Sequence, residues 1–158
     1  HLKRVGAVLD VVFLPIGLGS GFAGAAAARA HCGVDSRLVG VVSAHATAYL
    51  ESWRAGRVVQ SPANTLLADG MACRSPDSEA LAIVQREAAD VVAVTDDEVA
   101  QAMRALYTDT HNLAEGPGPA PLAGAWQQRE QWKGRSVGIT VSGGNVDAPV
   151  FAKVLQAG

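Results

Sequence analysis

Two glycine-rich turns have residue types and spacing suited to holding a charged ligand. Residues 17–21 (GLGSG) follow an apolar run at 11–16 and precede an alanine-rich segment, and residues 142–145 (SGGN) follow the run SVGITV. Glycine lets a backbone turn tightly and bring its N–H groups close to a ligand. A helix that starts after such a turn adds free N–H groups and the positive end of its dipole. The first turn therefore predicts an anion site of the kind that binds phosphate.

The elements that must position these turns alternate along the chain. We expect strands at 11–16, 37–43, 91–95 and 136–141, and helices at 21–32, 45–55, 77–89, 95–110 and up to about 156. Thr95 and Glu98 have the spacing of a capping box, which predicts a helix start there. The alternation predicts an α/β fold of three layers: a mostly parallel sheet with helices on both faces. Both glycine turns then lie at the carboxyl edge of the sheet, where ligands bind in such folds.

The composition sets limits on the class of protein. The chain has 158 residues, 49% of them hydrophobic and 18% charged, which is enough for one domain with its own core. A net charge of −2 gives no reason to expect a nucleic acid or an anionic membrane as partner. No apolar run approaches the roughly 20 residues that span a bilayer. The two cysteines, Cys32 and Cys73, favour a reduced, cytoplasmic setting over a disulfide framework.

The glycine turn at 17–21 has three possible ligands, besides the possibility that it is a tight turn with no ligand. Residues 19–24 (GSGFAG) fit the dinucleotide pattern G-x-G-x-x-G, and a nucleoside methyl donor is a second possibility. Both need an acidic ribose partner after the second strand, and residues 41–44 (VVSA) contain none. The third possibility is a lone phosphate monoester, as on pyridoxal phosphate, which needs no acid.

Four stretches resemble the pyridoxal-phosphate-dependent serine/threonine dehydratases, including serine racemase, of the tryptophan-synthase-β-like superfamily (fold type II). They are 15–21 (PIGLGSG), 68–70 (ADG), 114–120 (AEGPGPA) and 142–147 (SGGNVD), and they occur in the family's order. The last stretch matches the family's SGGN(V/I)D almost letter for letter. The resemblance covers nearly the whole chain and implies that the fold is part of the family's large, cofactor-binding domain.

The resemblance implies pyridoxal 5′-phosphate as cofactor and assigns roles to particular residues. The phosphate would bind to backbone N–H groups of the first turn, with the Ser142 hydroxyl at the pyridine nitrogen and Glu115 nearby; the turn consists of Gly17, Leu18, Gly19, Ser20 and Gly21. A serine cannot fully protonate the ring, and a neutral ring suits β-elimination better than transamination. The implied reaction removes water from serine, threonine or a similar hydroxy amino acid, giving a 2-oxo acid and ammonia.

Several positions depart from the family pattern. Leu18 and Ser20 replace glycines of the phosphate loop. The positions of two carboxylates that hold a metal in part of the family are Val42 and Ala48 here, so we expect no metal. The family's Schiff-base lysine lies in its N-terminal half, and none of the three lysines of this chain, at positions 3, 133 and 153, has that context. We therefore expect no catalytic residue in this chain.

The chain begins at His1, and residues 1–10 have the pattern of a helix end that leads into the first strand. We expect residues 1–158 to be one α/β segment from the C-terminal part of the large domain, inactive alone, with the missing N-terminal part or a second copy covering its sheet edge. A nucleotide-binding domain and a non-catalytic association module remain alternatives. Stabilisation by a nucleotide alone would favour the former.

The other polar and aromatic residues are expected to be structural. His31, His45 and His111 are not clustered, so surface or capping roles are expected. Cys73 is expected to be a buried or incidental thiol. Trp126 and Trp132 are expected to pack at a helix end rather than to stack on bases, and residues 96–98 (DDE) to start a helix rather than form a catalytic pair.

Overall fold

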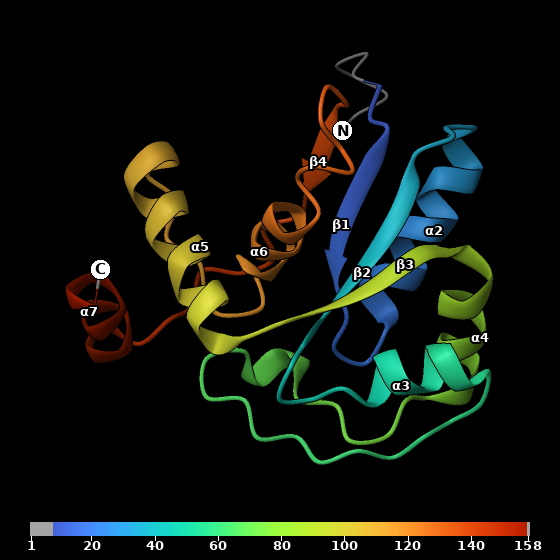
Figure 1. Ribbon diagram of the computed structural model, residues 1–158, viewed down its shortest axis with the longest axis horizontal. Coiled ribbons are helices and arrows are strands. Elements are labelled where there is room, and N and C mark those ends of the chain that lie inside the picture. The colour runs from blue at the N-terminus through green and yellow to red at the C-terminus, as the bar shows by residue number, and fades with distance from the viewer. Residues whose placement is uncertain (1–7, 158) are drawn as a thin grey trace.

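A single parallel sheet lies at the centre of the fold (Figure 1). The computed structural model describes residues 8–157, and within them four strands pair in the order β3-β2-β1-β4. Every neighbouring pair is parallel. The strands are β1 (Val11–Pro15), β2 (Arg37–Ser43), β3 (Ala88–Val94) and β4 (Val137–Ile139). The sequence-based prediction of a parallel α/β sheet is confirmed.

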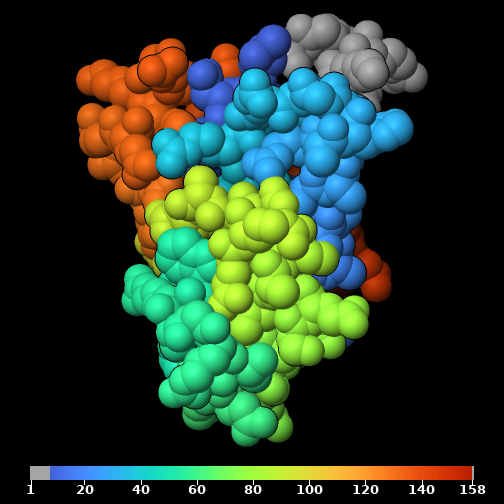
Figure 2. Space-filling view, turned by 90° about the vertical axis from the view of Figure 1, so that its right-hand side faces the viewer, coloured from blue at the N-terminus to red at the C-terminus, as the bar shows by residue number. Residues whose placement is uncertain are grey.

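Helices cover both faces of this sheet. One face carries α2 (Ser20–Cys32), α3 (Ala48–Ala55) and α4 (Ser78–Glu87), which share a buried cluster with residues of β1, β2 and β3. On the other face α6 (Ala120–Gln127) packs on the strands, α5 (Asp96–Thr110) packs on α6, and α7 (Ala148–Gln156) packs on α5; the three helices share a second cluster. Figure 2 looks onto the first side, where the atoms of α2 (blue) and α4 (yellow-green) lie against each other. The expected three layers are therefore present.

Strand β1 is one of the two inner strands of the sheet, and both of its faces are covered. Val11 and Phe13 are fully buried in the cluster with α5 and α6, whereas Leu14 is buried in the cluster with α2 and α4. A central parallel strand is apolar on both faces for this reason. The apolar run at 11–16 thus reflects the helix layers on both faces of the sheet.

Several element boundaries differ from the prediction: strand β4 is confined to Val137–Ile139 rather than 136–141, helix α4 ends at Glu87 rather than 89, and two elements begin three residues away from the expected positions. Helix α3 begins at Ala48 rather than near position 45, because the N–H groups of His45 and Ala46 bond to the Ser43 hydroxyl and carbonyl in a tight turn. Strand β3 begins at Ala88 rather than at 91, because α4 passes into it without a loop. The helix end expected within residues 1–10 lies mostly outside the described residues.

Helix α5 begins with the predicted capping box. The Thr95 hydroxyl accepts a hydrogen bond from the Glu98 N–H, and the Glu98 carboxylate accepts one from the Thr95 N–H at 2.7 Å. These bonds pair N–H groups that a helix start leaves free. With 15 residues α5 is the longest helix of the described part, and no helix there is long and apolar enough to cross a membrane.

Replacing the capping threonine tests how much this box stabilises the fold. The substitution Thr95→Ala is expected to lower the free energy of unfolding by about 1 kcal/mol, because the Glu98 N–H loses its acceptor. Thr108→Ala, at an exposed position inside α5, is the matched control and should change it by less than about 0.5 kcal/mol. Urea unfolding followed by circular dichroism measures both. Equal effects of the two substitutions would contradict the capping role.

Candidate functional site

The strand order reverses next to β1: the chain adds β2 and β3 on one side of β1 and then places β4 on its other side. From β1 it proceeds through α2 to β2 and β3 on one side, and it returns through α5 and α6 to β4 on the other side of β1. The connections after β1 and β4 therefore diverge to opposite faces. In open α/β sheets such a switch point leaves a crevice beyond the carboxyl ends of the two strands, and ligands bind there.

A hollow of about 390 Å³ lies at this switch point. The turn after β1 and the turn after β4 both line it, together with the 3-10 turn η1 (Asp69–Met71) and the connection between α5 and α6. Its lining includes Gly17, Leu18, Gly19, Ser20, Gly21 and Ser142, and also Gly70, Met71, Glu115, Pro117 and Thr140. All six residues that the sequence singled out for ligand binding thus meet in one hollow.

The first turn presents a row of backbone donors to this hollow. Within the described residues, the N–H groups from Gly17 to Phe22 take part in no hydrogen bond; the first bonded N–H of helix α2 is that of Ala23, which reaches the Gly19 carbonyl at 2.9 Å. The helix start adds its positive dipole end at the same place. Free N–H groups at the start of a helix form an anion site.

Two glycines of this turn are required by its geometry. A Cβ on Gly17 would clash with the Gly70 carbonyl oxygen, which is rigid backbone. Gly19 has a φ of 92°, which disfavours any other residue, and a Cβ there would lie 2.6 Å from the Tyr49 hydroxyl. Leu18, by contrast, is 74% exposed without positive φ, so the leucine that replaces a family glycine is accommodated.

Tyr49 supports the first glycine turn from the buried core, and no sequence pattern indicated this contact. Its hydroxyl donates a hydrogen bond to the Leu18 carbonyl at 2.8 Å, across 31 positions of the sequence, and its side chain is 1% exposed. Burial, followed by the nearby Cys73 and Asp77, raises the pKa of Tyr49 from 10.0 to about 12. The hydroxyl therefore stays protonated and remains a donor at ordinary pH.

The segment that carries η1 is held in place by Asp96. The Asp96 carboxylate accepts hydrogen bonds at 2.8 Å from the Thr65 hydroxyl and from the Leu66 N–H. The Thr65 hydroxyl in turn accepts one from the Ala68 N–H. Residues 96–98 were expected only to start a helix, and they do so; the sequence did not reveal that Asp96 also fixes the floor of the hollow. Such a contact joins a loop to the start of a helix about 30 positions away and leaves no local pattern.

The second glycine turn packs against Glu115. Gly143 has a φ of 130°, and a Cβ there would clash with the Glu115 side chain. The Glu115 N–H also donates to the Gly143 carbonyl at 3.2 Å. Ser142, the preceding residue, is exposed and faces the same hollow. Glu115 thus contacts the turn that carries Ser142, as its expected place near the ligand requires.

None of the described residues that line the hollow has a cationic side chain. Among its lining residues the only ionisable group is Glu115. Lys133 lies in the turns that precede β4, and Lys153 lies on α7; neither lines the hollow, and Lys3 lies outside the described residues. The donors that these lining residues offer to an anion are therefore backbone N–H groups and hydroxyls. No lysine of the described part is placed to act as a nucleophile in it.

The remaining side chains that the sequence singled out lie elsewhere. His31, His45 and His111 are exposed, and His111 ends α5 with a φ of 57°, which is a capping position. Cys73 is buried, and burial raises the pKa of its thiol, which makes it a poor nucleophile. The Arg37 guanidinium lies 5.6 Å from the Trp132 ring centre, so this tryptophan packs as expected. Within residues 8–157, no three His, Cys, Asp or Glu side chains gather as a metal site would require.

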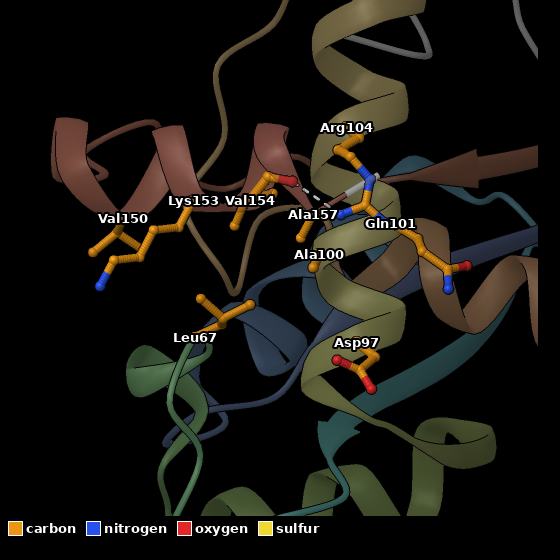
Figure 3. A pocket seen from close by; sticks show the side chains of 9 residues that line it. All are labelled: Leu67, Asp97, Ala100, Gln101, Arg104, Val150, Lys153, Val154 and Ala157. Atoms are coloured by element: carbon orange, nitrogen blue, oxygen red, sulfur yellow. Dashed lines mark hydrogen bonds between the residues drawn. The ribbon is translucent and has the colours of Figure 1, made fainter.

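A second hollow of about 390 Å³ lies between α5 and α7 (Figure 3). Its walls are mostly apolar, with Leu67, Val150 and Val154 among them. The Arg104 guanidinium donates a hydrogen bond to the Val154 carbonyl at 3.0 Å. The Lys153 side chain extends away from Arg104 (Figure 3). The cationic groups here do not converge on a common point. This groove therefore lacks the arrangement of donors found at the switch point.

Comparison with known proteins places this geometry in context. The model of the pyridoxal-phosphate dependent enzyme family matches residues 2–143. The chain is 34% identical to an L-threonine ammonia-lyase of Geobacter sulfurreducens, over 93% of this chain. It superimposes on threonine deaminase isoform 2 from Solanum lycopersicum with a TM-score of 0.89 at 25% identity, over 98% of this chain, and on maize serine racemase with 0.84 at 28%, over 99%. The expected family and fold are confirmed.

The chain spans at most about half the length of these relatives. It covers 37% of the Geobacter protein, 46% of the tomato protein chain and 49% of the maize protein chain. The matches thus extend over nearly all of this chain but over only part of each relative.

The close approach of Gly17 to Gly70 can be tested by adding one methyl group. Gly17→Ala is expected to lower the free energy of unfolding by about 1–3 kcal/mol, because the Gly70 backbone must move to admit the Cβ. Gly24→Ala, in α2, is the matched control: its Cβ meets nothing within 4 Å, and alanine should stabilise the helix by up to about 1 kcal/mol. Thermal unfolding measures both. A neutral Gly17→Ala would show that the turn is not held as described.

Proposed function

Because this chain belongs to the pyridoxal-phosphate dependent enzyme family, we propose that its switch-point hollow binds the phosphate of pyridoxal 5′-phosphate. The donors are the backbone N–H groups of Gly17, Leu18, Gly19, Ser20 and Gly21, with the Ser20 hydroxyl as an additional donor. The observation that carries the proposal is the row of unpaired N–H groups at the start of α2. A phosphate monoester pairs several such groups at once and complements the helix dipole.

The shape of the hollow also supports this ligand, in addition to the donors that complement its charge. Glycine at positions 17 and 19 keeps the backbone free of side chains where an anion must come close. The hollow continues from this turn to Ser142 and Glu115, so it has room for a group attached to the phosphate. A dinucleotide needs a carboxylate at the end of the second strand. Strand β2 ends at Ser43, and neither Ser43 nor Ala44 supplies one.

Ser142 is proposed to be the partner of the cofactor's ring nitrogen. Its hydroxyl is exposed and faces the hollow. A hydroxyl can donate a hydrogen bond to a pyridine nitrogen but cannot transfer its proton, because its pKa is far above that of the ring. When bound, pyridoxal phosphate supplies an electron sink for chemistry at the α-carbon of an amino acid. Ser142 would keep the ring neutral and so favour β-elimination over transamination.

The proposed reaction of the whole protein is the dehydration of a hydroxy amino acid to a 2-oxo acid and ammonia. It is supported by the likeness to an L-threonine ammonia-lyase over nearly the entire chain. The likeness to a serine racemase leaves racemisation as an alternative that uses the same cofactor. The substrate is proposed to be serine, threonine or a similar small amino acid.

We propose that the Schiff-base lysine and the substrate-carboxylate site come from a segment outside these 158 residues. Two observations support this: no lysine of the described residues lines the hollow, and the chain spans 37–49% of the relatives it matches. Residues 1–158 would then be the C-terminal part of the large domain. That outside segment, or a second copy of the chain, would complete the site and cover the sheet edge.

A ligand panel tests the proposed cofactor. Pyridoxal phosphate is expected to raise the melting temperature of this chain. NAD and S-adenosylmethionine should leave it unchanged, because their ribose needs a carboxylate partner after β2 and pyridoxal phosphate does not. Inorganic phosphate should protect weakly, since it occupies the donor row alone. Thermal shift at matched ligand concentrations measures all four. Stabilisation by a nucleotide but not by pyridoxal phosphate would overturn the proposal.

The role of Ser142 can be separated from that of the phosphate turn. Ser142→Ala is expected to weaken binding of pyridoxal phosphate about 2- to 12-fold, the effect of losing one hydrogen bond of about 0.5–1.5 kcal/mol, and to leave binding of inorganic phosphate unchanged. Ser136→Ala, before β4 and outside the hollow, is the control. Isothermal titration measures both ligands. Equal weakening of both ligands would place Ser142 in the phosphate site instead.

A further inference from the structure

We propose that Tyr49 is a positioning residue that aims the Gly19 N–H into the phosphate site by holding the peptide plane between Leu18 and Gly19. This inference rests on the proposed function of the hollow. The Tyr49 hydroxyl donates to the Leu18 carbonyl at 2.8 Å. Tyr49 itself does not line the hollow. It acts on the ligand only through the backbone.

The planarity of the peptide bond transmits this effect. The carbonyl of Leu18 and the N–H of Gly19 belong to the same trans peptide, in which the two groups point in opposite directions. A hydrogen bond that draws the carbonyl toward Tyr49, on the protein side, therefore turns the N–H away from the protein. Leu18 and Gly19 both line the hollow, so that direction leads toward the proposed phosphate.

The turn needs this support because its own geometry does not fix it. Gly19, at a φ of 92°, has the widest conformational freedom of any residue, and Leu18 is 74% exposed and packs on little. A peptide between two such residues can rotate at small cost. The hydrogen bond from a buried side chain removes that freedom before a ligand arrives, which lowers the entropy that binding must overcome.

Tyr49 is itself rigidly placed. It lies on α3, is 1% exposed and packs in the cluster that includes Phe22, Cys73 and Leu81. A Cβ on Gly19 would meet both the Tyr49 hydroxyl and, at 2.8 Å, the Ala80 side chain. Helices α3 and α4 thus back the turn directly. The position of the hydroxyl is set by the core rather than by the exposed turn.

The test compares two ligands that differ only in the phosphate. They are 4-deoxypyridoxine 5′-phosphate and 4-deoxypyridoxine, which lack the aldehyde and so cannot react with lysines. Isothermal titration gives the dissociation constant of each for the full chain, and their ratio measures the contribution of the phosphate. Tyr49→Phe removes the hydroxyl and keeps the ring. Tyr107→Phe, an exposed tyrosine on α5 outside the hollow, removes an equivalent hydroxyl as control.

We expect Tyr49→Phe to weaken the phosphate-bearing ligand about five- to tenfold and to leave the dephosphorylated ligand unchanged, as the loss of one hydrogen bond implies. Tyr107→Phe should change neither. An unchanged ratio in Tyr49→Phe would overturn the inference, and so would an equal weakening of both ligands, which marks a merely structural role. If the unsubstituted chain shows no preference for the phosphate, the proposed function fails first.

A measurement on the unsubstituted chain keeps the inference testable even if Tyr49→Phe does not fold. Inorganic phosphate, titrated into the ¹⁵N-labelled chain, should shift the Gly19 amide proton downfield, because that N–H gains an acceptor. The Ala23 amide, already bonded within the helix, should shift much less. A Gly19 amide that does not respond while its neighbours in the turn do would overturn the inference.

Discussion

Close contacts between backbone segments hold the loops around the switch-point hollow, and the rest of the site depends on them. At these contacts only glycine leaves enough space. Gly17 lies against the Gly70 carbonyl, and Gly116 lies against that of Leu67. A Cβ at either position would push two loops apart. Because backbone atoms cannot rotate out of the way as side chains can, the loops fix one another's positions. The hydrogen bonds of Asp96 then tie the shared segment to the start of α5.

The sheet and these contacts divide the work of building the site. The parallel order β3-β2-β1-β4 brings the turns after β1 and β4 to one edge, and the helices on opposite faces keep them apart. The glycines would then let the turns approach a ligand, while Tyr49 supports the first turn from outside the hollow and Glu115, which lines the hollow, packs against the second. The proposed binding groups for the phosphate come from the backbone, and the side chains mainly hold the backbone in place. This division suits a family in which the cofactor supplies the chemistry.

Local and periodic features could be predicted from the sequence, whereas contacts between distant loops could not. The capping box at Thr95, the two-sided burial of β1 and the meeting of both glycine turns follow from residue types at short spacing and from the rule for parallel sheets. The bonds from Tyr49 to Leu18 and from Asp96 to Thr65 each span about 30 positions. Neither partner carries a pattern that identifies the other, so only the folded chain reveals them.

The absence of a lysine or arginine from the lining of the described hollow has a kinetic consequence. Fixed positive charges attract an anion over distances comparable to the Debye length, which is about 8 Å at physiological ionic strength. The field of peptide dipoles fades faster, so a phosphate senses this turn only when it is nearly in contact. These lining residues would therefore add no electrostatic steering of their own to the capture of the proposed phosphate. Selectivity among anions would then arise from the shape of the turn, once an anion has reached it, rather than from long-range attraction.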